Sequence, residues 1–533
     1  MGFSFGLMIA KLWEQILYFD WYWYLIIALL ASIKPIITFN SIIKETSPSM
    51  QVSNPLIRVF FLGAVFLLLF QSCITAIDTT VEKKASWIAG DHHIHSRFSV
   101  SFNSETDPLK ASPITGRDAF YPIPMNALMA RRFGLSWMVA TDHGGPNHSK
   151  VNLEKAYPEL ILSRELVPEV IQFFGMELNP PGADHSSLII PNSDNEAQQL
   201  FLLESKFDRQ EVFPIDPERN TEPRMIQALE LMNKLTPKPI IIANHPSRSA
   251  EKGQQYGLDD PAELRKWNDT APEVSVGMAG APGHQASTLN SDNTTRPQQF
   301  RGAYDQLPTM GGFDPMTARL GGFWDSMLGE GRHWWITANS DSHVHYTEGG
   351  SDFWPGEFSK TYVYAEKSYD AILEGIRSGR VFVTTGDLIS LLDVSVQFGS
   401  NTAQIGGSLS VSSGSDIEIT IKLKDPEKNN HHKENPSVER VDLITGKVSG
   451  LSLDPNNDRN PSTHVLNRFY QDNWSVKDEY KTMTYNLKNI TDNLYLRARG
   501  TNTTQLEPEP DPPGENPWTD LWFYSNPIFI QVQ

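Results

Sequence analysis

The stretch Trp137-Met-Val-Ala-Thr-Asp-His143 places an acid and a histidine directly after a short apolar run. The same arrangement recurs at Glu177 after residues 170–176, at His245 after residues 240–243, and at Asp341 with His343 after residues 334–338. Short apolar runs of this kind predict buried strands. In a barrel of parallel strands the carboxyl ends lie on one face, and that face carries the chemistry. These motifs are therefore expected to meet at one site.

Residues 86–392 alternate short apolar runs with helical segments, which predicts an α/β fold with parallel strands. The predicted strands are residues 137–140, 170–176, 187–190, 240–243, 334–338 and 360–364, and the predicted helices are residues 124–133, 222–235, 316–328 and 369–378. Residues 249–321, rich in Gly, Pro, Asn and Gln, predict a long insertion. Such an insertion is typical of an active-site lid, with a plain surface loop as the alternative.

After residue 392 the pattern changes to apolar and polar residues alternating at period two. The predicted strands are residues 417–423, 438–443, 482–487, 494–499 and 528–532. This pattern predicts an all-β, sandwich-like domain over residues 393–533. Its histidines, His431, His432 and His464, have no spacing typical of metal ligands, so they are predicted to lie on the surface.

The composition excludes several classes of function. With 533 residues the chain is long enough for two or three domains, and its 39% hydrophobic residues are typical of a folded globular protein. A formal net charge of −18 argues against nucleic acid as a partner, because phosphate backbones need a basic surface. The single cysteine, Cys73, excludes intramolecular disulfides and cysteine-ligated zinc fingers. Any metal site must therefore use nitrogen and oxygen donors.

The first 73 residues predict a membrane anchor or a signal. An apolar run over residues 59–70 follows Arg58 and has the length of a signal-peptide core, and Cys73 comes directly after it, as in a bacterial lipoprotein signal. Met50 begins a stretch that would form a complete signal alone, so residues 1–49 would then be an over-extended gene start. The alternative is a two-helix membrane hairpin formed with the earlier apolar run, residues 21–33. Both interpretations place the rest of the chain outside the cytoplasmic membrane, in the periplasm or outside the cell.

Two histidines, His93 and His95, stand two positions apart in Asp91-His-His-Ile-His95. On an extended segment such side chains point to the same face and can reach one site. Asp341 and His343 have the same spacing. Either pair alone is weak evidence, but together with Thr-Asp-His143, Glu177 and Asn-His-Pro246 they predict a shared metal site.

The order H-x-H-S, T-D-H, G-x-E followed by a histidine, H-P and D-S-H resembles the polymerase and histidinol phosphatase (PHP) superfamily over residues 86–392. The resemblance implies a distorted β/α barrel that binds two or three zinc, manganese or iron ions and hydrolyses phosphoesters. Residues 360–386 and the trailing β-domain resemble the branch that includes carbaryl hydrolases.

The resemblance implies eight metal ligands, which are His93, His95, His143, Glu177, His185, His245, Asp341 and His343. Glu177 matches the bridging carboxylate of the family. Many members with three metals carry another His or Asp about five residues after the first H-x-H, where this chain has Ser99-Val100-Ser101. Two metal ions are therefore expected, with three as the alternative.

Other residues near these motifs are candidates for catalysis or substrate binding. Asp142 is expected to orient a ligand histidine, with roles as a ligand or a general acid/base left open, and Asp341 or a pocket histidine could also carry a proton. Arg97, Arg248, His148 and His284 are candidates for contacting substrate, with a surface salt bridge as the alternative for each arginine. His92 and His345 are expected to be structural.

These observations predict a hydrolase in which metal-activated hydroxide attacks a small phosphoester, with Glu177, Asp341 and Asp142 at the catalytic centre. The alternative keeps the metals and attacks the carbonyl carbon of a carbamate, ester or amide. A different class, a non-catalytic surface binding protein that recognises its ligand through the β-domain, is disfavoured by the full ligand set.

Overall fold

The structure, a computed structural model, describes residues 84–101 and 114–533. The predicted anchor or signal over residues 1–73, with Met50 and Cys73, lies outside the described residues. A search of the described helices finds none with the length and apolar character that a membrane crossing requires.

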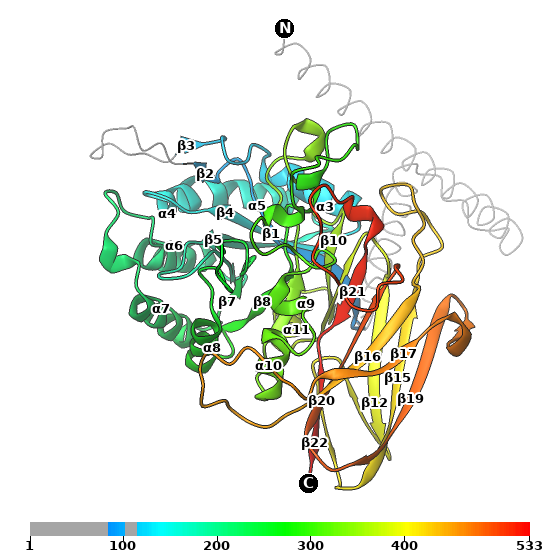
Figure 1. Cartoon of the computed structure of the whole chain (residues 1–533). Helices are drawn as coiled ribbons and strands as arrows, with labels where there is room; N and C mark the ends of the chain where they lie inside the picture. Colours follow the sequence, from blue (N-terminus) through cyan, green and yellow to red (C-terminus); the bar gives the residue numbers. More distant parts are fainter. Residues whose placement is uncertain (1–83, 102–113) are drawn as a thin grey trace, which may run out of the picture. The chain divides into compact units, whose positions relative to one another are not determined.

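A large mixed sheet has the strand order β14-β22-β20-β21-β11-β10-β1-β4-β5-β6-β7-β8-β9, with β16 paired to β20 and β17 paired to β16 (Figure 1). Its strands are β1 Ser86–Ile94, β4 Trp137–His143, β5 Ile171–Leu178, β6 Ser186–Ile190, β7 Ile240–Ala243, β8 Ser275–Ala281, β9 Trp335–Ala338, β10 Ser359–Ala365, β11 Val381–Thr385, β14 Ser408–Val411, β16 Arg440–Lys447, β17 His464–Phe469, β20 Leu494–Thr501, β21 Trp522–Ser525 and β22 Ile528–Val532. The predicted α/β class is thereby confirmed.

The strands of this sheet are only partly parallel. β1 and β4, β4 and β5, β7 and β8, and β8 and β9 pair in parallel. β6 is antiparallel to both β5 and β7, and β10 is antiparallel to β1. The connection 179–185 between β5 and β6 is too short for the crossover that parallel pairing requires. The predicted parallel strands are therefore confirmed in part, and the strand pairings among the described residues do not close into a barrel.

Helices lie outside the strands of the N-terminal part of the large sheet, as Figure 1 shows for α6, α7 and α8. The helices are α3 Ile123–Arg132, α4 His148–Val151, α5 Tyr157–Leu166, α6 Glu196–Phe207, α7 Glu222–Lys234, α8 Pro261–Thr270, α9 Pro315–Ala318, α10 Phe323–Gly329 and α11 Tyr369–Arg377. The helix predicted over residues 316–328 is divided into α9 and α10. Gly321, at φ +71°, lies in the break, where a left-handed backbone conformation ends helical geometry.

The predicted insertion, residues 249–321, is only partly a loop. It contains α8 and β8, and β8 is fully buried between β7 and β9. β8 is rich in glycine and alanine because it packs closely on β9: a Cβ atom at Gly277 would lie 1.9 Å from the carbonyl oxygen of Trp335. A strand without large apolar residues carries no strong sequence signal, which is why it was not predicted.

A second, five-stranded sheet is antiparallel, with the order β13-β12-β15-β19-β18. Its strands are β12 Leu391–Phe398, β13 Asn401–Gln404, β15 Ser415–Lys424, β18 Ser475–Lys477 and β19 Tyr480–Ile490. One apolar cluster contains Val394 and Ile419 of this sheet and Leu443, Leu496 and Phe523 of the large sheet. The two sheets therefore share a core, and the large sheet continues across residue 392 through the pairing of β11 with β21.

A third, two-stranded sheet pairs β2 Val100–Ser101 with β3 Ile114–Thr115. It lies directly after the first histidine motif. The pairing of Val100 with Thr115 returns the chain to the neighbourhood of His95, and this return matters for the site described next.

Candidate metal centre

The end of β1 is shaped to present two histidines. The Asp91 carboxylate accepts hydrogen bonds from the backbone amides of His93 and Ser340, both at 3.0 Å. Thr141 on β4 accepts the amide of Ile94 through its hydroxyl at 2.7 Å. The ladder between β1 and β4 shifts register at this point, between Asp91 and Ile94. Irregularities of this kind re-aim side chains near active sites.

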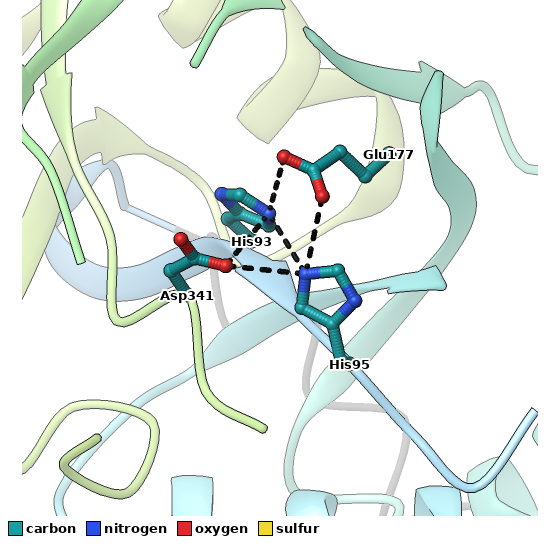
Figure 2. A group of neighbouring side chains, drawn as sticks. All are labelled: His93, His95, Glu177 and Asp341. Carbon is teal, nitrogen blue, oxygen red and sulfur yellow. Dashed lines mark hydrogen bonds and ion pairs between the residues drawn. The ribbon is translucent and has the colours of Figure 1, made fainter. Parts of the chain in front are cut away.

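His93 and His95 face Glu177 and Asp341 in a buried group (Figure 2). Nε2 of His93 lies 3.1 Å from Oε1 of Glu177 and 3.1 Å from Oδ1 of Asp341. Nε2 of His95 lies 3.2 Å from Oδ1 of Asp341 and 3.5 Å from Oε2 of Glu177. The four side chains reach this point from β1, from the end of β5 and from the segment after β9.

The donor atoms of this group fit a divalent metal ion. The two Nε2 atoms are only 3.0 Å apart, and two buried carboxylates surround them. Oδ1 of Asp341 accepts no hydrogen bond despite being buried. Burying two carboxylates is costly unless a cation compensates them. Imidazole and carboxylate donors are the ligands that zinc, manganese and iron accept.

Glu177 also joins a second group of histidines. Nε2 of His143 lies 3.2 Å from Oε2 of Glu177, and Nε2 of His245 lies 3.2 Å from Oε1. Nδ1 of His185 lies 3.5 Å from Oε1. The parallel register of β4 and β5 pairs His143 with Glu177 directly. A carboxylate shared in this way can bridge two ions, and the neighbouring Asn244 orients it by donating a 3.1 Å hydrogen bond to Oε1.

A third group consists of His95, Asp118 and His343. Nε2 of His343 lies 3.4 Å from Oδ2 of Asp118. Asp118 was not predicted, because it lies far along the chain from His95 and from the position where the family carries a further ligand. The β2–β3 pairing brings Asp118 to Ser99, whose hydroxyl donates to it. The residues just after His95 supply no such donor, but Asp118, from further along the sequence, lies where it could act as one.

The electrostatics divide the histidines of the site into two kinds. Burial lowers the pKa of His95 to about 4, of His143 to about 3 and of His245 to about 4, which favours the neutral rings that offer lone pairs to a metal. Burial also acts on His93, His185 and His343, but there the neighbouring carboxylates outweigh it and raise the pKa of each ring, that of His343 to about 10. Burial opposes ionisation of Glu177, but the surrounding histidines hold its pKa well below the ordinary value. Deprotonated carboxylates and neutral imidazoles are the forms that bind metals.

Two further donors converge on Oδ2 of Asp341, the oxygen that faces away from His93. Nη1 of Arg248 donates to it at 2.8 Å, and Nε2 of His284 lies 3.2 Å away. Nδ1 of His284 is hydrogen-bonded to Asp352, so the ring is held on both sides. His245, His284 and Asp341 have positive φ values of 32°, 56° and 49°. Non-glycine residues in this region are uncommon and gather at functional sites.

The remaining sequence candidates lie outside the three groups. His148 is buried, with Nδ1 at 2.6 Å from Glu204 and Nε2 at 3.0 Å from the carbonyl oxygen of Phe98, so neither ring nitrogen is free for substrate. Arg97 pairs with Glu159 and its side chain is 50% exposed, which matches the salt-bridge alternative.

Asp142 is also outside the groups. It accepts hydrogen bonds from the amide and hydroxyl of Ser96 at 2.5 and 2.8 Å and so holds the segment that carries His95. His92 bonds to Ser187 and Thr337, and His345 bonds to Glu357, as expected of structural residues. His431 and His464 are exposed, and His432 stacks on Trp518.

The eight predicted ligands therefore lie together, joined by Asp118 and flanked by Arg248 and His284. No protein-family model matches the chain, and none of the curated proteins searched matches it.

Proposed function

We propose that this protein is a metal-dependent hydrolase of the PHP type that acts on a small phosphoester. The observation that carries the proposal is the convergence of nine histidine and acidic side chains around Glu177, His95 and His343. Motif order alone suggested eight of them, and the folded chain adds Asp118 beside the same histidines. A non-catalytic protein that recognises its ligand through the β-domain would not need so many potential metal ligands at one point.

The distorted barrel implied by the motif order belongs to the same proposal. Ile94 and Ser342 form a parallel bridge, and the amide of His95 donates to the carbonyl oxygen of Ser342 at 2.9 Å. This contact brings the segment after β9 back to β1, at the far end of the run of strands from β1 to β9. Such a return is what a barrel with an incomplete final ladder would contain.

The three groups suggest three divalent ions rather than two. His93, His95, Glu177 and Asp341 would hold one ion, His143, His185, His245 and Glu177 a second, and His95, Asp118 and His343 a third. When bound, the ions supply an activated water and neutralise negative charge on the substrate. Asn244 keeps Glu177 oriented, and Asp142 keeps the His95 segment in place through Ser96.

Arg248 supports an anionic substrate. Its Nε and Nη2 groups are buried and lack an acceptor, while Nη1 is bound to Asp341. A guanidinium with free N–H groups beside a metal centre suits two oxygens of a phosphoryl group. A neutral carbamate would leave those groups without a charged partner. The side chains of Asp118, His185 and His143 are 27%, 24% and 21% exposed, so an incoming substrate could reach the centre from the side of these residues.

The decisive experiment compares bond classes on one preparation. The protein loaded with zinc or manganese is assayed on aryl phosphates and on aryl carbamates. We expect the parent protein to hydrolyse a phosphoester and His93→Ala to lose this activity. The control His464→Ala, which alters an exposed histidine of the β-domain, should keep the activity of the parent. Turnover of carbamates without phosphoester activity would replace the proposed substrate class. Unchanged metal content in His93→Ala would remove the metal centre itself from the proposal.

A further inference from the structure

The C-terminal part of the chain reaches toward the metal centre through the segment 510–520. Asp511 of this segment is buried and accepts hydrogen bonds from the amides of Gly311 and Gly312 at 2.6 and 2.9 Å and from the hydroxyl of Thr309 at 2.7 Å. The amide of Asp511 donates in turn to the carbonyl oxygen of Thr309. The segment is therefore bound to the loop that precedes α9 by side-chain and backbone hydrogen bonds.

Arg301 lies at the centre of this contact and is fully buried. Its Nη1 donates to Glu515 at 2.9 Å and lies 3.7 Å from Asp511. Asp511, Glu515 and Asp520 are close enough together to resemble a cation site, and the guanidinium supplies the positive charge among them. Gly312 makes this placement possible, since a Cβ atom there would lie 2.3 Å from Nη2 of Arg301. The missing side chain at Gly312 thus leaves room for the Arg301 guanidinium.

The other side of Arg301 faces the loop that carries His284. Nε of Arg301 donates to the side-chain oxygen of Gln285 at 3.1 Å, and the amide of Gly302 donates to the carbonyl oxygen of His284 at 3.0 Å. The amide nitrogen of the Gln285 side chain bonds to the carbonyl oxygens of Pro282 and Gly312. His284 has a left-handed backbone at φ 56°, a conformation that its surroundings must enforce.

We propose that Arg301 is a positioning residue of the metal centre, held by Glu515 and Asp511 of the C-terminal segment, and that it acts through His284. His284 contacts Oδ2 of Asp341 and thereby sets the orientation in which Oδ1 faces His93 and His95. The C-terminal part of the chain is, on this view, a built-in component of the active site. The kinetic part of this inference rests on the proposed hydrolase function, but the geometric part does not.

The test uses two readouts on the full chain, kcat with a phosphoester and the absorption spectrum of the cobalt(II)-loaded protein. We expect Arg301→Met to lower kcat by about 10–100-fold, the cost typical of removing a group that orients a metal ligand. We expect His284→Asn to cause a similar loss, and the double variant to lose no more than His284→Asn alone. Residues that act through one another are non-additive, whereas independent effects multiply. The cobalt spectrum should shift in the same way in both single variants, with metals per chain unchanged.

Arg497→Met is the matched control. Arg497 is also fully buried, is paired with Asp325, and joins the C-terminal part to α10 through that pair rather than through the residues of the metal centre. It should lose stability without a change in kcat or in the cobalt spectrum. Glu515→Gln is the milder variant and decides the matter if Arg301→Met does not fold; it should shift the spectrum in the same direction.

Multiplicative losses in the double variant, or a native cobalt spectrum in both Arg301→Met and Glu515→Gln, would overturn the inference. Absence of hydrolysis with a shifted spectrum would instead overturn the proposed function and leave the positioning role of Arg301 standing.

Discussion

The hydroxyl of Ser99 donates a hydrogen bond to Oδ2 of Asp118 across 2.6 Å, although the two residues are 19 positions apart. Ser99 also lies 3.1 Å from Nδ1 of His95 and accepts the amide of His143 at 3.0 Å. One serine thus connects Asp118 with two predicted ligands. Buried polar contacts that orient ligands in this way are characteristic of metal centres.

We predict that Asp118→Asn lowers the metal content by one ion per chain. The asparagine side chain carries no negative charge, and His95 and His343 alone offer only neutral donors to an ion. The group around Glu177 keeps all its donors. Elemental analysis of the purified protein measures the change directly. Asp305→Asn, which alters an acid outside the three groups, should keep the parent's content. Equal metal content in both variants would show that Asp118 is not a ligand.

Glu177→Gln should have a larger effect, because Glu177 contacts histidines of two groups. We expect the affinity for two of the ions to fall by more than about 100-fold, beyond the cost of losing an orienting residue. Competition with a metallochromic chelator measures the affinities. A single weakened site would mean that Glu177 does not bridge two ions.

Arg248 distinguishes the two candidate bond classes. Its guanidinium makes a planar fork that a lysine cannot reproduce, so Arg248→Lys should rescue little of the activity lost in Arg248→Met. Removing one partner of a buried, hydrogen-bonded charge contact costs about 2–5 kcal/mol, or roughly 30-fold to several thousand-fold. The loss should appear in kcat/KM for phosphoesters and be much smaller for neutral carbamates. Equal losses on both substrate classes would indicate that Arg248 mainly holds Asp341.

The strands around the site could be predicted because their apolar runs are continuous. β7 begins and ends at the predicted residues, 240 and 243, and β4, β5, β9 and β10 differ from prediction by a few residues at most. His245 and Asp341 follow such strands, and His143 and Glu177 lie at the carboxyl ends of β4 and β5, so the meeting of these residues could be expected before the fold was known. The local pattern of apolar residues is enough to predict a strand where the strand is short and its apolar run is continuous.

Other features depend on contacts that the local sequence does not encode. β8 is a strand because Gly277 allows close packing on β9, and this is decided by Trp335, far along the chain. Asp118 joins the site because β2 and β3 pair. The sequence marked His284 and Arg248 as candidates for contacting substrate, but their convergence on one oxygen of Asp341 is visible only in the fold. These relationships are tertiary and could not be predicted from spacing.

The N-terminal anchor remains a prediction from the sequence, and Cys73 tests it. Cys73→Ser removes the thiol that a lipid would modify. If lipidation holds the protein, the variant should move from the membrane fraction to the soluble fraction, as measured by blotting of fractionated cells. Retention of the variant in the membrane would favour the two-helix hairpin over residues 1–73.

The buried pair of His148 and Glu204 should make stability depend on pH. Burial alone would lower the pKa of His148, but the Glu204 carboxylate at 2.6 Å outweighs burial and raises the pKa to about 9. Folding therefore takes up a proton between pH 6.5, the ordinary value, and about 9. The stabilisation is fully present below pH 6.5 and is lost as the pH rises through 9, amounting to at most about 3 kcal/mol.

The measurement is the free energy of unfolding in urea between pH 7.5 and 9.5. This pH range lies above the titration of Asp208 and Glu211, because burial raises their pKa values only to about 6 and about 7. The double variant His148→Gln, Glu204→Gln removes both charges and keeps hydrogen-bonding groups, so its stability should fall less steeply with pH than that of the parent. A steeper fall of the free energy of unfolding with pH in the parent than in the double variant is the signature of the charged pair. Equal dependence on pH in the two proteins would mean that His148 is neutral in the folded state.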